Sequence, residues 1–184
     1  MAVQKTGMTR EDFERFIARA ENTDHLFELI NGDLIEKMPT QLHAYIIQMI
    51  SGFLFVFLRQ NPLGYALVEA RYRLPGNEEN DIIPDLSFVI KARELVQSGA
   101  APYMPDLAVE AQSEGQSDKF MLDKALLYLA NGTRMVWIIY STRGIIEVLT
   151  PTERKLLKLE ENANLDGGDV LPGLSIPLRE IFPE

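Results

Sequence analysis

The sequence predicts a mixed α/β fold in which helices flank a central β-sheet. Segments with helical and strand periodicity alternate along the chain, in the order helix, hairpin, helix, strands, helix, strands. The composition, with 46% hydrophobic and 24% charged residues, is typical of a globular domain. No repeat, low-complexity run or long linker divides the 184 residues. We therefore expect residues 1–184 to form a single domain.

The N-terminal third predicts a helix, a hairpin and a second, longer helix. The first helix covers 9–21, with Thr9 as its cap and an apolar stripe that includes Phe13. Asn31-Gly32 lies between two apolar runs, which is a strong hairpin signal because both turn residues need positive φ. The long helix begins after Pro39-Thr40 and ends at Asn61-Pro62. Its apolar stripe contains Ile46, Ile50, Phe53 and Phe57.

The remainder of the chain predicts strands on both sides of one helix. Strands are expected at 65–74, 81–90, 106–112, 135–140 and 145–149, and the helix at 118–131. Pro84 has no amide hydrogen for a sheet, so it requires an edge, a bulge or a strand start. The apolar tail and the Trp137 region are expected to offer surface for a partner copy.

Charge, cysteine count and terminal residues exclude several classes of protein. The 18 basic and 27 acidic residues give a net charge of −9, which disfavours a general affinity for nucleic acid but allows a local basic cleft or a metal-bridged phosphate. Cysteine is absent and only two histidines are present, so thiolate and multi-histidine metal sites are excluded. We expect a cytoplasmic protein with no membrane span, because no secretory signal is visible and the apolar stretch 44–58 is short and interrupted by polar residues.

Glu110 is the most informative candidate for a functional site. Side chains alternate between the faces of a strand, so Glu110 and Gln112 are expected on the face opposite Leu107 and Val109. Acidic residues are depleted in strands, and a carboxylate next to a carboxamide indicates an open polar site. Taken alone, such a pair more often lies on a solvent-facing edge.

Asp85 adds a second carboxylate, directly after Pro84 at the entry to an apolar strand. Singly, such a residue is more often part of a turn. Together, Asp85 and Glu110 could bind one hard divalent cation, and Mg²⁺ held by one or two carboxylates suits phosphoryl chemistry. The outline is Pro-Asp followed by Glu-x-Lys, with Gln112 at the position of the lysine.

This pattern resembles the PD-(D/E)XK nuclease superfamily, and the wider sequence is similar to the Uma-type family of restriction endonuclease-like proteins. Seven segments carry the resemblance in the correct order: Phe27–Gly32, His43, Asp106–Glu110, Lys124 with Tyr128, Val136–Ile139, Leu171–Leu174 and Ile181-Phe182. This chain departs from the family at two positions: Gln112 stands where the family usually has an apolar residue, and Glu114 stands where it usually has proline. The resemblance implies a restriction-endonuclease-like fold and dependence on Mg²⁺, for which Mn²⁺ could substitute.

The resemblance also implies that the catalytic lysine has moved to the helix, at Lys124, while Gln112 remains a competing substitute within the strand. Without the resemblance, Lys124 would be read as a solvated helix residue. We expect Lys124 to supply the charge, because glutamine is neutral and cannot offset the charge that develops on the phosphoryl group.

Four other residues are weaker candidates. His43 could contact the substrate or a metal-bound water, or could equally be a helix-start histidine without such a role. Arg71 and Arg73 share a strand face and could contact phosphates. Glu28 could be a third acidic group near the metal, although an exposed position in the hairpin is the preferred reading.

The favoured function is a metal-dependent nuclease that hydrolyses phosphodiesters, with DNA as the expected substrate and partner. A homodimer is expected, because two symmetric sites could cut both strands of a duplex. The main alternative is a non-catalytic module of the same fold that acts in binding or assembly, which the acidic charge and the irregular Gln112 position favour. Neither spacing nor a sugar-binding aromatic cluster supports a metal-free carboxylate-pair hydrolase.

Overall fold

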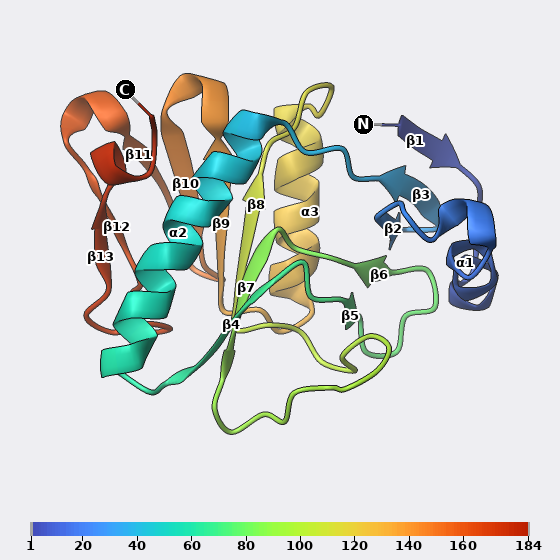
Figure 1. Cartoon of the computed structure of the whole chain (residues 1–184). Helices are drawn as coiled ribbons and strands as arrows, with labels where there is room; N and C mark the ends of the chain where they lie inside the picture. Colours follow the sequence, from blue (N-terminus) through green and yellow to red (C-terminus); the bar gives the residue numbers. More distant parts are fainter. Residues whose placement is uncertain (1, 184) are drawn as a thin grey trace.

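The computed structural model describes residues 2–183 and has a six-stranded central sheet (Figure 1). In spatial order its strands are β11 (Arg154–Lys158), β10 (Ile145–Leu149), β9 (Met135–Tyr140), β8 (Leu107–Ala111), β7 (Leu86–Ile90) and β4 (Gly64–Val68). Neighbouring strands are antiparallel except for β8 and β9. That parallel pair needs a crossover connection, which α3 (Asp118–Ala130) supplies.

Two helices cover opposite faces of the central sheet, α2 (Gln41–Gln60) on one and α3 on the other (Figure 1). Leu107 and Val109 of β8 belong to the core beneath α2, whereas Ala108 belongs to the core beneath α3. The alternation predicted for this strand is therefore confirmed. It places Glu110 on the α3 side of the sheet.

A second, five-stranded sheet lies beside the first, with α1 (Arg10–Ile17) next to it (Figure 1). Its spatial order is β1 (Ala2–Lys5), β3 (Asp33–Glu36), β2 (Phe27–Ile30), β6 (Asp81–Ile82) and β5 (Tyr72–Arg73). The predicted hairpin is β2–β3, and its turn residues Asn31 and Gly32 have φ of 51° and 77°. Thr9 caps α1 in a capping box, as its sequence position indicated.

Two predicted strands are each divided, which corrects the sequence-based boundaries. The segment 65–74 splits into β4 and β5 around Glu69, whose φ is 51°. The segment 81–90 splits into β6 and β7 around Pro84. In both cases the chain crosses between the two sheets, and local periodicity carries no signal for such a crossing. The consequence is that Asp85 lies at the junction of the sheets, directly before β7.

The C-terminal region completes the core instead of forming a free surface. A small sheet in this region pairs β12 (Asn164–Asp166) with β13 (Ser175–Pro177), and short 3₁₀ helices cover Leu159–Glu161 and Leu178–Glu180. Two further 3₁₀ helices lie earlier in the chain, at Ala20–Asn22 and Ser141–Arg143. Trp137 is fully buried, and the tail residues Leu171, Ile181 and Phe182 pack in the same core. The expectation that these residues offer surface for a partner copy is wrong.

The long helix α2 extends the predicted apolar stretch to 20 residues. By length and composition alone it could cross a membrane, with a mean hydropathy of 1.6 and 28% of the window buried. Core helices of other proteins meet the same criteria. Ile46, Ile50 and Leu54 of α2 are fully buried against the central sheet. The apolar side of α2 therefore packs on the central sheet as a core helix.

Gly64 at the start of β4 allows close packing between this edge strand of the central sheet and its neighbour β7. A Cβ atom there would lie 2.0 Å from the carbonyl oxygen of Val89 in β7 and 2.8 Å from the ring of Phe88. We expect Gly64→Ala to lower the free energy of unfolding by about 1–3 kcal/mol, because backbone must move to make room. Urea denaturation measures the change.

Gly52 in α2 provides the matched control, because a Cβ there would meet no atom within 4 Å. Gly52→Ala is expected to raise the free energy of unfolding by about 0.5–1 kcal/mol, the usual gain for alanine inside a helix. Equal effects of the two substitutions would contradict the packing argument.

Candidate active site

The two sheets, α2 and α3 meet around a small polar pocket. Carboxylates, ammonium groups and an imidazole line it: Glu28, Lys37, His43, Asp85, Glu110 and Lys124. All of them are buried except Lys37, which is partly buried. The cavity measures about 10 Å³, roughly the room for one water molecule. The space between these charged groups is therefore filled by the groups themselves.

Asp85 is held from three directions. Leu86 pairs with Val109 in the antiparallel register, and extending that register by one residue sets Asp85 opposite Glu110. Its Oδ2 accepts a hydrogen bond from the amide of Ala111 at 2.8 Å, and its Oδ1 lies 2.5 Å from Lys37 Nζ. Burial alone would raise the pKa of Asp85, but the charge of Lys37 and the bond to His43 bring it well below its usual range. Asp85 is therefore an anion.

Glu110 extends from β8 beneath α3. The hydroxyl of Tyr128 donates to its Oε1 at 2.6 Å, and Lys124 Nζ lies 2.8 Å from the same oxygen. Oε2 takes part in neither contact. Burial raises the pKa of Glu110 to about 7, and the nearby charge of Asp85 adds to this rise while Lys124 opposes it. Burial also raises the pKa of Tyr128 well above its usual value, so its hydroxyl remains a donor.

Lys124 and Tyr128 are four residues apart, so one side of α3 presents both to the sheet. Lys124 Nζ donates to both carboxylate oxygens of Glu28, each at 2.8 Å, and its side chain is 2% exposed. Burial by itself would lower the pKa of Lys124, but the carboxylates of Glu110 and Glu28 raise it, so the ammonium stays charged.

Glu28 corrects the preferred reading of the sequence, which placed it on an exposed hairpin. It is 2% exposed, and its Oε1 also accepts from the amide of Ile83 at 2.7 Å. The neighbouring residues of β2 do not reveal that Glu28 is buried. The strand that pairs with β2 on this side, β6, comes from a distant part of the chain.

Lys37 is a site residue that the sequence did not reveal. It follows β3 directly and donates to the carbonyl oxygen of Ile83 at 2.7 Å, in addition to its ion pair with Asp85. Burial would lower its pKa, but the carboxylates of Asp85, Glu28 and Glu110 raise it well above its usual value. No motif includes Lys37, and only the three-dimensional fold brings it to the pocket.

His43 lies in the first turn of α2, which Thr40 caps by accepting from the His43 amide. Its Nε2 is 3.3 Å from Asp85 Oδ2, and its Nδ1 is 3.4 Å from the hydroxyl of Ser113. The structure therefore brings His43 to the pocket, where it contacts the aspartate rather than open solvent.

Gln112 does not share the pocket, which corrects the expectation from strand alternation. β8 ends at Ala111, and the Gln112 side chain turns toward the start of α3. Its Nε2 donates to the carbonyl oxygen of Gln116 at 2.9 Å and to Asp118 at 3.0 Å, while its Oε1 accepts from Arg143 at 3.3 Å. The alternation rule fails here because the strand has already ended.

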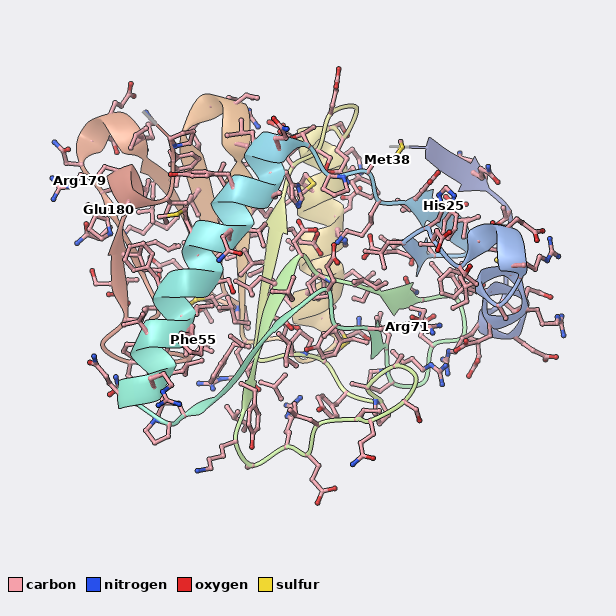
Figure 2. The ribbon with its side chains drawn as sticks, viewed as in Figure 1. His25, Met38, Phe55, Arg71, Arg179 and Glu180 are labelled. Atoms are coloured by element: carbon pink, nitrogen blue, oxygen red, sulfur yellow. The ribbon has the colours of Figure 1, made fainter. Side chains whose placement is uncertain are left out.

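Arg71 and Arg73 also lie away from the pocket. Both form ion pairs with Glu14 of α1 and Asp81 of β6, so their charges are already compensated. Figure 2 shows Arg71 near α1 and the second sheet, well apart from Met38 at the rim of the pocket. These arginines join α1 to the second sheet. Neither of them lines the pocket, so the structure does not support the predicted phosphate contacts.

The donor set suits a hard cation held by few protein ligands. Within residues 2–183, no three histidine, cysteine or acidic side chains are arranged to hold an ion. Mg²⁺ usually takes only one or two carboxylates from a protein and keeps several waters. Asp85, directly before β7, and Glu110, on the adjacent strand β8, line one pocket and fit that requirement.

The mixed α/β fold, with helices on both faces of its central sheet, is of the restriction-endonuclease-like type. The chain belongs to the Uma2 family, whose model is described as "Putative restriction endonuclease" and matches residues 10–179. The predicted family resemblance is therefore confirmed. No protein in the curated set matches the sequence significantly.

A solved structure with the same fold confirms the predicted fold class. It is the crystal structure of a putative nuclease belonging to DUF820 from Anabaena variabilis, with a TM-score of 0.79 and 22% sequence identity. The match covers 95% of this chain and 97% of the other. At this level of identity the likeness concerns the fold.

Proposed function

We propose that this protein hydrolyses phosphodiester bonds with the help of Mg²⁺, for which Mn²⁺ substitutes. One observation carries the proposal: Asp85, directly before β7, and Glu110 of the adjacent strand β8 line one pocket, and the Lys124 ammonium lies 2.8 Å from Glu110. Two buried carboxylates next to a buried cation are unusual in a core unless a function maintains them. The family description favours DNA as the substrate.

In this proposal each residue of the pocket has a distinct role. Asp85 and Glu110 would hold the ion, which when bound activates a water and offsets charge on the phosphate. Lys124 places a positive charge beside Glu110, where it can stabilise charge that develops on the phosphoryl oxygens. Tyr128 fixes the Glu110 carboxylate, and His43 fixes Asp85.

The competing proposal is a non-catalytic module with the same fold. The filled pocket and the net charge of −9 favour it, because both oppose the approach of a polyanion. The two proposals differ in what they predict for divalent cations. A nuclease requires a metal site that depends on Asp85, whereas a binding module does not.

The test is a Mn²⁺ titration by calorimetry, together with cleavage of a supercoiled plasmid in Mg²⁺, in Mn²⁺ and in EDTA. Asp85→Asn is expected to lose both metal binding and cleavage. Asp123→Asn serves as the control, because Asp123 is an exposed acid on α3 that pairs with Lys119. A wild-type chain that neither binds Mn²⁺ nor cleaves would favour the non-catalytic module.

We further propose that the active form is a homodimer, because two symmetric sites can cut both strands of a duplex. Light scattering is expected to give twice the 20.8 kDa of one chain at micromolar concentration. A mass of one chain under these conditions would reject the dimer.

A further inference from the structure

Lys37 binds the Asp85 oxygen that a metal ion would need as its ligand. Oδ2 of Asp85 already accepts the amide of Ala111, so Oδ1 is the oxygen not used by the backbone, and Lys37 Nζ lies 2.5 Å from it. An ammonium nitrogen and a divalent cation prefer the same carboxylate oxygens. The Lys37 ammonium and a metal ion cannot occupy the same side of Oδ1 at once, because each would lie within about 2.5 Å of it.

Charge and space favour exchange of the two cations. Three carboxylates, those of Glu28, Asp85 and Glu110, face only two ammonium groups, those of Lys37 and Lys124, so their formal charges sum to −1. The cavity between them has room for about one water. A divalent cation added to this arrangement would crowd three cations into a buried pocket and bring the sum of formal charges to +1. If one ammonium leaves, it makes room for the ion, and the formal charges of three carboxylates, one ammonium and one divalent cation sum to zero.

The two lysines differ in how firmly they are held. Lys124 contacts two glutamates and its side chain is 2% exposed. Lys37 contacts one carboxylate and one carbonyl group, and its side chain is 11% exposed. Lys37 is next to Met38, an exposed residue that lines the same pocket and is labelled in Figure 2. Lys37 is thus the lysine with a route to solvent.

We propose that Lys37 is an exchangeable internal cation, which neutralises Asp85 in the metal-free protein and leaves Oδ1 when a divalent ion binds. This inference rests on the proposed function, since it assumes that Asp85 is a metal ligand. After it leaves Asp85, the ammonium is at the pocket rim, where a substrate phosphate would enter. Lys37 would then be a phosphate-positioning residue of the metal-bound state only.

Calorimetric titration with Mn²⁺, at about pH 8 so that the carboxylates are ionised, tests the exchange. Lys37→Met keeps a long, unbranched side chain that lacks only the terminal ammonium, and thereby removes the competing charge, so Mn²⁺ affinity is expected to rise by about tenfold or more. Lys119→Met removes the same charge from an exposed site on α3 and is expected to leave affinity unchanged. Unchanged or weaker binding by Lys37→Met would overturn the proposal.

Amine labelling of the wild-type protein provides a second test that requires no variant to fold. Mass spectrometry of acetylated protein is expected to show more label on Lys37 when saturating Mn²⁺ is present, while Lys124 stays protected. If Mn²⁺ binds and labelling of Lys37 does not change, the exchange is rejected and the metal site stands. If neither wild type nor Lys37→Met binds Mn²⁺, both the exchange and the proposed metal site are rejected.

Discussion

Lys124→Ala is expected to slow Mn²⁺-supported plasmid cleavage by about 10²–10³-fold, the usual loss when a group that stabilises developing charge is removed. Gln112→Ala is expected to stay near the wild-type rate, because Gln112 contacts Asp118 and Arg143 outside the pocket. The ammonium of Lys124 is beside Glu110, whereas the neutral amide of Gln112 is not.

Loss of Lys124 also leaves Glu28 and Glu110 without their shared cation, so folding of the variant must be measured first. Circular dichroism and a thermal melt serve this purpose, and rates are compared at a temperature where both variants are folded. Wild-type activity in Lys124→Ala, combined with inactive Gln112→Ala, would mean that the strand position supplies the catalytic group after all.

Glu28→Met is expected to lower the free energy of unfolding by about 3–5 kcal/mol, the usual effect of breaking a buried ion pair from one side. The substitution removes two contacts with Lys124 and the acceptor for the Ile83 amide, all in the interior. Glu36→Met in the next strand is the control. Its partner His25 is half exposed, so the expected loss is below about 1 kcal/mol. Urea denaturation gives both values.

The double variant Glu28→Met/Lys124→Met separates the ion pair from general packing. Each single variant loses the Glu28–Lys124 ion pair, so the loss of stability in the double variant is expected to be smaller than the sum of the losses in Glu28→Met and Lys124→Met. If the two losses simply added, Glu28 would contribute through packing and not through its charge.

Local patterns in the sequence were sufficient for much of the fold. The Asn31-Gly32 turn, the cap at Thr9 and the alternation in β8 depend on neighbours within a few residues, and the structure has all three. The same alternation placed Glu110 on one face of its strand. The proximity of Lys124 to Glu110 came from the family resemblance, because its helix position alone indicates a solvated lysine.

Other features depend on contacts between distant segments, which local patterns do not record. Glu28 and Lys124 are 96 positions apart, and nothing near either residue reveals the pairing. Lys37 belongs to no motif and reaches Asp85 only because the two sheets meet. Gln112 was misplaced because the end of β8 is set by the turn toward α3 and not by the residue pattern.

The arrangement of two sheets around one pocket has a consequence for folding kinetics. The charged groups come from the first hairpin, the start of β7, β8 and α3, so the pocket closes only after loops of many tens of residues have formed. Contacts of such long range are made late and slow the folding of mixed α/β domains. The ion pairs of Glu28 with Lys124 and of Lys37 with Asp85 join the first hairpin to distant segments, so they require that hairpin to have docked. Refolding monitored by Mn²⁺ binding should therefore lag behind the recovery of helical circular dichroism.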